Sequence, residues 1–206
     1  MNETPIDLYA NEVRGIRGGR QTQVRRVAKH PLARAAKRIL SYNGQTEFDC
    51  VLEDDSGGII RCPYGMPGDR LWVRETWAPN DVLPLSDRPS GDFIYRADLN
   101  HLGQSKYSGG WRPSIHMPRC ASRITLEIES VRVEKLGDIT EEDARAEGVM
   151  PDSFEGMEHP DNPTLSISAH RSAFVGLWES IHGPGTWELN PGVWVIQFRK
   201  VEPSGC

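Results

Sequence analysis

A single carboxylate within an apolar strand pattern is the clearest chemical feature of the sequence. In residues 70–77 the side chains of Leu71, Val73, Glu75 and Trp77 fall on one strand face, because successive side chains alternate. Burying a charge on that face costs free energy unless the charge is paired, hydrogen-bonded or neutralised. The pattern therefore indicates either a general base or water-positioning group with a raised pKa, or a buried Glu–Arg ion pair.

A second concentration of functional side chains lies in residues 111–123. This segment holds one indole, one imidazole, two serine hydroxyls and three guanidinium groups, with two prolines that stiffen it. Proteins that bind single-stranded nucleic acid stack bases on aromatic faces and hold phosphates with arginine. The alternative is a structured loop in which His116 only satisfies backbone groups.

Charge is spread unevenly along the chain, whose net charge is −5. Residues 14–38 contain nine Lys or Arg and no acid, whereas residues 127–161 contain twelve acids against three bases. A basic block on an acidic molecule can attract a phosphate to one face while the remainder repels indiscriminate binding to nucleic acid. A solvated surface helix is the other interpretation of the basic block.

Several classes of protein are excluded by composition. The 206 residues fit one well-cored domain. No apolar run approaches the roughly 20 residues that span a bilayer, and the N-terminus lacks the pattern of a signal peptide. The cysteines form no pair or Cys/His cluster at zinc spacing: Cys50, Cys62, Cys120 and Cys206. We expect a cytoplasmic chain with free thiols, no metal, no cofactor and no membrane contact.

Glycine, proline and asparagine mark the ends of elements in the first half of the chain. The patterns predict, in order, a short helix around Val13 and Ile16 that ends at Gly18, an extended segment at 21–27, a helix over 31–42, a hairpin of 50–52 with 59–60, and strands at 70–77 and 93–95.

The second half carries clearer patterns. Residues 123–134 alternate as a strand, and the phase changes between Ile128 and Val131, which predicts a bulge or bend. Thr140 and Asp143 predict the capped start of a helix over 138–148. A further helix with one apolar face is predicted around residues 174–181, and a strand at 193–201.

These elements predict an α+β fold, a small twisted β-barrel with peripheral helices. Strands outnumber helices, and no βαβ rhythm appears. We expect a single domain over residues 1–206, with loop-rich insertions at about 28–60, 79–110 and 149–168.

Three segments together resemble the ASCH-domain family. Residues 19–26 (GRQTQVRR) resemble its GRKTxTRR element, residues 67–77 (PGDRLWVRETW) resemble its PGDxLWVRExW strand, and residues 114–123 resemble the equivalent stretch of phage and prophage members. The resemblance implies a PUA-like barrel, binding of RNA or a nucleotide, and a bacteriophage or prophage origin in the cytoplasm of a bacterial host.

One branch of that family hydrolyses the amide of N4-acetylcytidine with a lysine, a threonine and the strand glutamate. Glu75 matches this glutamate, but Gln21 stands at the lysine position and Val24 at the threonine position, and only Thr22 between them keeps a hydroxyl. Glutamine does not titrate and valine donates no hydrogen bond. Since each positioned group is worth a factor of about 10² to 10⁴, we place a binding module ahead of an enzyme.

The leading hypothesis is therefore a cleft that binds RNA or a modified or signalling nucleotide. The residues expected to bind it are Arg20, Arg25, Arg26, Arg74, Trp77, Tyr95, Ser114, His116, Arg119 and Arg123. The second hypothesis is a hydrolase of a modified nucleoside, with Glu75 as base and Gln21 or Thr22 orienting substrate or water. The third is a phage protein-interaction factor that uses the acidic residues of 127–161.

Overall fold

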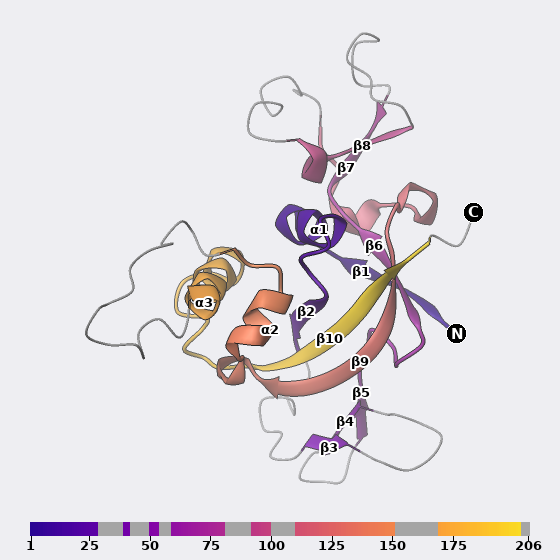
Figure 1. Ribbon diagram of the computed structural model, residues 1–206. Coiled ribbons are helices and arrows are strands. Elements are labelled where there is room, and N and C mark those ends of the chain that lie inside the picture. Colours follow the sequence, from indigo (N-terminus) through magenta and orange to yellow (C-terminus); the bar gives the residue numbers. More distant parts are fainter. Residues whose placement is uncertain are drawn as a thin grey trace.

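The computed structural model describes residues 1–28, 39–41, 50–53, 59–80, 92–99, 110–150 and 169–202. Its strands are β1 (Glu3–Asp7), β2 (Gln23–Val27), β3 (Ile39–Ser41), β4 (Cys50–Glu53), β5 (Ile59–Arg61), β6 (Arg70–Arg74), β7 (Trp77–Pro79), β8 (Phe93–Tyr95), β9 (Thr125–Lys135) and β10 (Gly192–Val201). Its helices are α1 (Ala10–Arg17), α2 (Glu141–Ala146) and α3 (Ala169–His182), with short 3-10 turns η4 (Arg96–Asp98), η5 (Ser114–His116), η6 (Arg119–Ala121) and η7 (Leu136–Asp138). The predicted α+β class is confirmed (Figure 1).

Five strands form the central sheet in the order β1-β6-β9-β10-β2. β1 runs parallel to β6, and the other neighbours are antiparallel. The prediction of a closed barrel is wrong, because closure needs a backbone ladder between β1 and β2. Among the described residues these strands are the two edges, and the Arg26 side chain donates to the Asp7 carbonyl at 2.9 Å instead.

The bend predicted within residues 123–134 is confirmed as a bulge in β9. Ser130 pairs with Gln197 of β10, whereas the next pair along the ladder is Ile128 with Phe198. Glu129 is therefore the extra residue, and it lies where the apolar alternation changes phase. A bulge of this kind bends the strand, and Figure 1 shows β9 and β10 curving together along the sheet.

The two faces of β10 pack against different cores. Trp194, Ile196 and Phe198 belong to the main core, which also contains Val13 and Ile16 of α1. The alternate side chains of β10, Val193 and Val195, face the other way. They pack with Ala144 of α2 and with Phe174 and Trp178 of α3. Helix α1 therefore covers one face of the sheet, and α2 with α3 cover the other.

The helix ends follow local signals in the sequence. The Tyr9 amide donates to the Glu12 carboxylate at 2.8 Å at the start of α1, and the helix ends at Gly18. Thr140 accepts a hydrogen bond from the Asp143 amide at 3.1 Å, as the capping pattern predicts. These caps fix where α1 and α2 meet the sheet.

Two predicted elements differ from the structure. Residues 70–77 are not one strand, because β6 ends at Arg74 and β7 pairs with β8 in a separate two-stranded sheet. The Glu75 amide donates to the Met117 sulfur at 3.3 Å instead of a strand partner. Residues 39–41 form β3, beside the confirmed β4–β5 hairpin, so the helix predicted over 31–42 does not extend that far. Residues 31–38 and most of the predicted insertions lie outside the described residues.

No helix in the described part of the chain is both long and apolar enough to cross a membrane.

Candidate functional site

Glu75 lies where the chain leaves the central sheet. Its side chain is 2% exposed, and its carboxylate accepts hydrogen bonds from Arg123 Nε at 2.8 Å and Nη2 at 2.9 Å. Burial raises the pKa of Glu75, and the paired guanidinium opposes this increase. The buried Glu–Arg ion pair that the sequence analysis set beside a general base is therefore present.

The aromatic side chains near this pair are engaged inside the protein. The Arg123 guanidinium lies over the Tyr95 ring, 3.8 Å from its centroid, and the Tyr95 hydroxyl donates to the Ala121 carbonyl at 2.8 Å. Trp77 is buried, with its ring edge-to-face with Phe93 at 5.4 Å. The buried Trp77 ring is therefore not open for a base to stack on, and one face of the Tyr95 ring is covered by Arg123.

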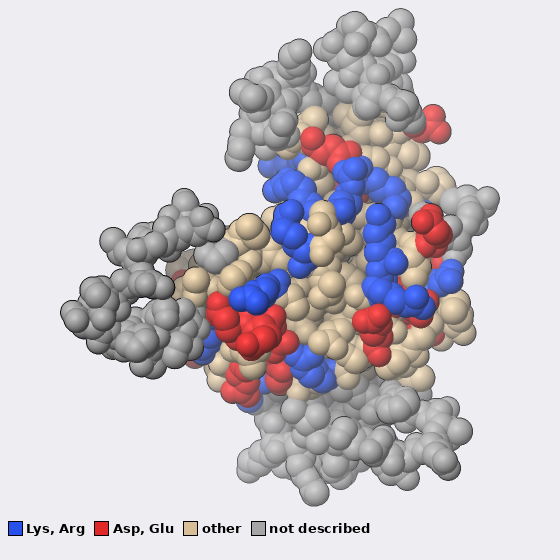
Figure 2. All heavy atoms as spheres, viewed as in Figure 1, with Lys and Arg blue, Asp and Glu red and all other residues tan. Residues whose placement is uncertain are grey.

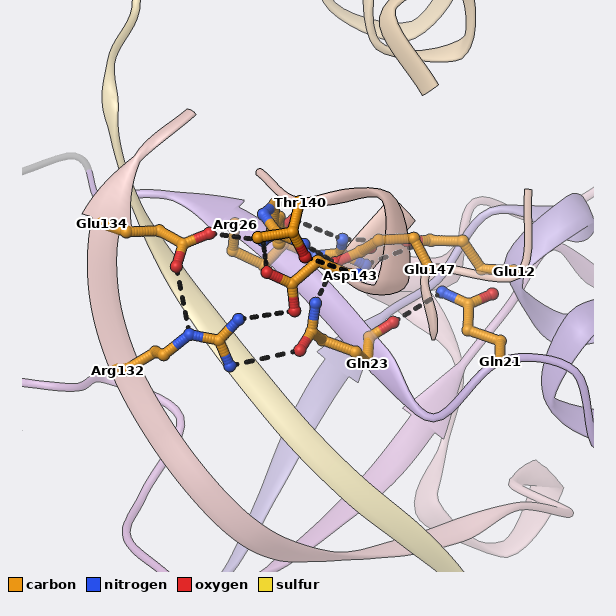
Figure 3. Close-up of polar contacts among 10 residues, drawn as sticks. Glu12, Gln21, Gln23, Arg26, Arg132, Glu134, Thr140, Asp143 and Glu147 are labelled. Atoms are coloured by element: carbon orange, nitrogen blue, oxygen red, sulfur yellow. Dashed lines mark hydrogen bonds and ion pairs between the residues drawn. The ribbon is translucent and has the colours of Figure 1, made fainter. Parts of the chain in front are cut away.

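Arg25 is the centre of a buried polar network that joins β2, β9 and the end of α2. It donates to Glu147 at 2.7 Å and pairs with Asp143 at 3.1 Å and with Glu134. Arg132 donates to the same Glu134 and Asp143, at 3.0 and 2.7 Å. Figure 3 shows Arg132 and Glu134 of β9 together with Asp143 of α2. Arg25 is thus held by carboxylates of the acidic block.

The positions that match the hydrolase motif lie in different environments. The side-chain amide of the buried Gln21 donates a hydrogen bond to the backbone carbonyl of Gln23 at 3.0 Å (Figure 3). The Thr22 side chain is exposed, and Val24 is fully buried in the main core. In the part of the chain that the structure describes, no interaction joins Gln21 or Thr22 to Glu75.

A cleft of about 1000 Å³ lies between β1, the start of α1, and the ends of β2 and β6. Three of the predicted binding residues line it: Arg26, Arg74 and Ser114. Its other polar lining residues are Asp7, Tyr9, Asn11, Arg14, Tyr64, Thr76, Arg96 and His182. The lining therefore holds four arginines and one carboxylate.

The four arginines of the cleft differ in their partners. Arg26 donates to the Glu12 carboxylate at 2.9 and 3.0 Å, and Arg74 donates to Asp7 at 2.7 Å. Arg14 and Arg96 are exposed, and neither has a carboxylate partner among the described residues. In Figure 2, basic side chains gather over α1 and over the β1–β6 side, with uncharged atoms between them.

The cleft also presents flat and apolar surfaces. Tyr9 and Ile115 line it and are 50% and 59% exposed. Burial raises the pKa of the Tyr64 hydroxyl in its wall, against the opposing effect of Arg26, so this hydroxyl stays neutral and can donate a hydrogen bond. Arginine beside aromatic faces is the combination that holds single nucleotides and short strands.

The remaining predicted binding residues lie outside this cleft. Arg119 pairs with Glu3 at 3.1 and 3.2 Å, and His116 is exposed on η5. Arg20 is also exposed and lines a separate cavity beside α1. The thirteen-residue segment 111–123 thus contributes Pro113, Ser114 and Ile115 to the cleft, while its arginines serve other contacts.

Sequence reasoning missed most residues of the cleft, among them Tyr9, Arg14, Tyr64 and Arg96. The sequence did contain a hint for Arg14, because this residue begins the basic block of residues 14–38, which contains no acid. Arg96 directly follows the predicted strand 93–95, but nothing local shows that η4 packs beside α1, where the Arg14 guanidinium meets the Ala97 carbonyl at 3.5 Å.

Within the described ranges, no group of three or more His, Cys, Asp or Glu side chains could hold a metal ion, and neither Cys62 nor Cys120 forms a disulfide there. Comparisons with protein-family models, curated proteins and solved structures found no match for this chain.

Proposed function

We propose that the chain is an ASCH-type binding module whose cleft holds a phosphate-bearing nucleotide, either free or within an RNA strand. The observation that carries this proposal is the excess of arginine in the cleft, four against one carboxylate, on a chain of net charge −5. Such a site attracts phosphate locally while the rest of the surface repels polyanions. Its volume of about 1000 Å³ is at the upper end of small-molecule sites, roughly 300 to 1,000 Å³.

Each part of the ligand has a candidate partner. Arg14 and Arg96 have no carboxylate partner in the described structure and can take phosphate oxygens, whereas Arg26 and Arg74 are held in place by Glu12 and Asp7. Tyr9 offers a partly exposed ring for a base. Arg74 Nε and Asp7 Oδ1 are buried without a hydrogen-bond partner in the described structure.

The family part of the proposal rests on the sequence resemblance of residues 19–26, 67–77 and 114–123. It includes a PUA-like fold, here with an open central sheet, and a phage or prophage origin. Helix α1, which precedes the first of these segments, and strand β2, which overlaps it, also contribute to the cleft.

We do not extend the proposal to amide hydrolysis. Both Glu75 oxygens accept hydrogen bonds from Arg123. These bonds favour the ionised carboxylate, but they also take up the oxygen atoms that would have to accept a proton from water or substrate. Glu75 is also absent from the residues that line the cleft. A positioned base must reach the proton it removes, and we therefore propose that Glu75 serves the stability of the fold.

The direct test is calorimetric titration with uridine 5′-monophosphate at low salt. Arg96→Gln removes a cation of the cleft that has no carboxylate partner in the described structure, so we expect about tenfold weaker binding. Arg145→Gln is the matched control, because Arg145 is exposed on α2 and does not line the cleft. Equal binding by the two variants, or no binding by the wild type of either this nucleotide or short uridine oligonucleotides, would overturn the proposal.

A further inference from the structure

A second cavity of about 570 Å³ adjoins the cleft along α1. It lies between α1, the chain around Gly148 and helix α3. Arg20, Gln21 and Ser180 supply polar groups, while Leu177 and Met150 supply apolar surface. Met150 is 64% exposed, so this surface is open to a ligand.

The two cavities share one wall. Asn11 and Arg14 line both, and they lie three residues apart, on the same face of α1. Arg14 is exposed at this boundary and has no carboxylate partner in the described part of the chain. A ligand that fills the first cavity therefore meets the same guanidinium as a ligand that fills the second.

Three arginines without a described carboxylate partner are distributed along the two cavities. Arg96 lies in the first cavity, Arg14 at the shared wall and Arg20 in the second. None of the three forms an ion pair with a described carboxylate. The Glu147 carboxylate of the second cavity is itself paired with Arg25, so its charge is largely compensated.

We propose that the two cavities together bind a single-stranded oligonucleotide, with successive phosphates at Arg96, Arg14 and Arg20. This inference rests on the proposed nucleotide cleft and specifies its ligand as a strand rather than one nucleotide. Tyr9 and Ile115 in the first cavity, and Met150 and Leu177 in the second, provide surfaces for bases on either side of Arg14.

Affinity as a function of strand length tests this inference. Uridine 5′-monophosphate and uridine di-, tetra- and hexanucleotides are titrated into the wild type, Arg20→Gln and the control Arg145→Gln. We expect binding to tighten from the mononucleotide to the tetranucleotide. Arg20→Gln should weaken the tetranucleotide roughly tenfold and leave the mononucleotide unchanged. It should also lower the salt slope for the tetranucleotide by about 0.7.

The possible failures are distinguishable. If the mononucleotide binds as tightly as the longer strands, or if Arg20→Gln behaves like Arg145→Gln with all of them, the two-cavity inference is overturned. Mononucleotide binding that Arg96→Gln weakens would then still support the proposed cleft. Absence of binding by every one of these ligands would overturn both proposals.

Discussion

At the scale of single residues, the ion pair with Arg123 offsets the free-energy cost of burying the Glu75 carboxylate. Removing one member of a buried pair leaves an uncompensated charge, at a cost of about 3–5 kcal/mol. Arg123→Gln should therefore lower the free energy of unfolding by about this amount at neutral pH, measured by urea denaturation. Arg119→Gln is the control, because the Arg119–Glu3 pair is partly exposed and worth about 1 kcal/mol or less. Equal losses in the two variants would contradict the assignment of Glu75 to stability.

The buried Glu147 carboxyl should make the free energy of unfolding depend on pH. Burial raises its pKa above the ordinary value of 4.5, and Arg25 opposes the increase. A carboxyl whose pKa is raised on folding contributes stability at pH values below its ordinary pKa, and this contribution is lost as the pH rises through the raised value. Glu147→Gln removes that loss. The unfolding free energy of the variant, minus that of the wild type, should increase as the pH is raised from about 4. Parallel urea-denaturation profiles over this range would disprove the raised pKa.

At the scale of elements, the end of α2 depends on a close approach to Gln21. Gly148 has a φ of +73°, and a Cβ at this position would lie 2.8 Å from the Gln21 Cβ. Gly148→Ala should therefore destabilise the fold by about 1–2 kcal/mol from backbone strain, with crowding in addition.

Gly176 in α3 is the matched comparison. It is exposed, and a Cβ there meets no atom within 4 Å. Gly176→Ala should therefore stabilise the protein by about 0.5–1 kcal/mol. Thermal denaturation of both variants measures the difference, and equal melting temperatures would show that the Gly148 contact has no structural role.

Elements defined by neighbouring residues were predictable from the sequence. The cap at Thr140 and the bulge at Glu129 follow from adjacent residue types and from a change of alternation. The end of β6 was not predictable, because it depends on Met117, which lies 42 positions from Glu75. Strand β3 was hidden for a similar reason, since its pairing with β4 outweighs a helical composition.

The candidate site was predictable only in part. The sequence identified Glu75 as buried and offered a Glu–Arg pair, but could not choose Arg123 from the many arginines. It placed Arg25 and Trp77 in a cleft, whereas tertiary packing buries both. Arg26, Arg74 and Ser114 do line the cleft, because the strand ends that carry two of them meet beside α1.

At the scale of the whole molecule, the basic and acidic blocks partly neutralise each other inside the fold. Arg25 of the basic block is held by Glu134, Asp143 and Glu147 of the acidic block. This pairing withdraws three carboxylates from the surface on which the protein-interaction hypothesis depends. Among the described residues, the cleft lining keeps four arginines against one carboxylate.

This arrangement predicts two different responses to salt. Raising salt from about 50 to 200 mM should weaken nucleotide binding, because phosphate contacts release counterions. The free energy of unfolding should change little, because buried pairs such as those of Arg25 are screened less than exposed ones. Parallel titration and urea denaturation at both salt concentrations check this. A loss of stability as steep as the loss of binding would contradict it.

The most direct test of the nucleotide cleft is an NMR titration that compares uridine 5′-monophosphate with uridine at low salt. We predict that the monophosphate shifts the amide signals of Tyr9, Tyr64 and Ser114, three residues that line the cleft. Uridine, which lacks the phosphate for Arg14 and Arg96, should shift them far less. Equal shifts with both ligands, or no shift at these residues with the monophosphate, would contradict a phosphate-binding cleft.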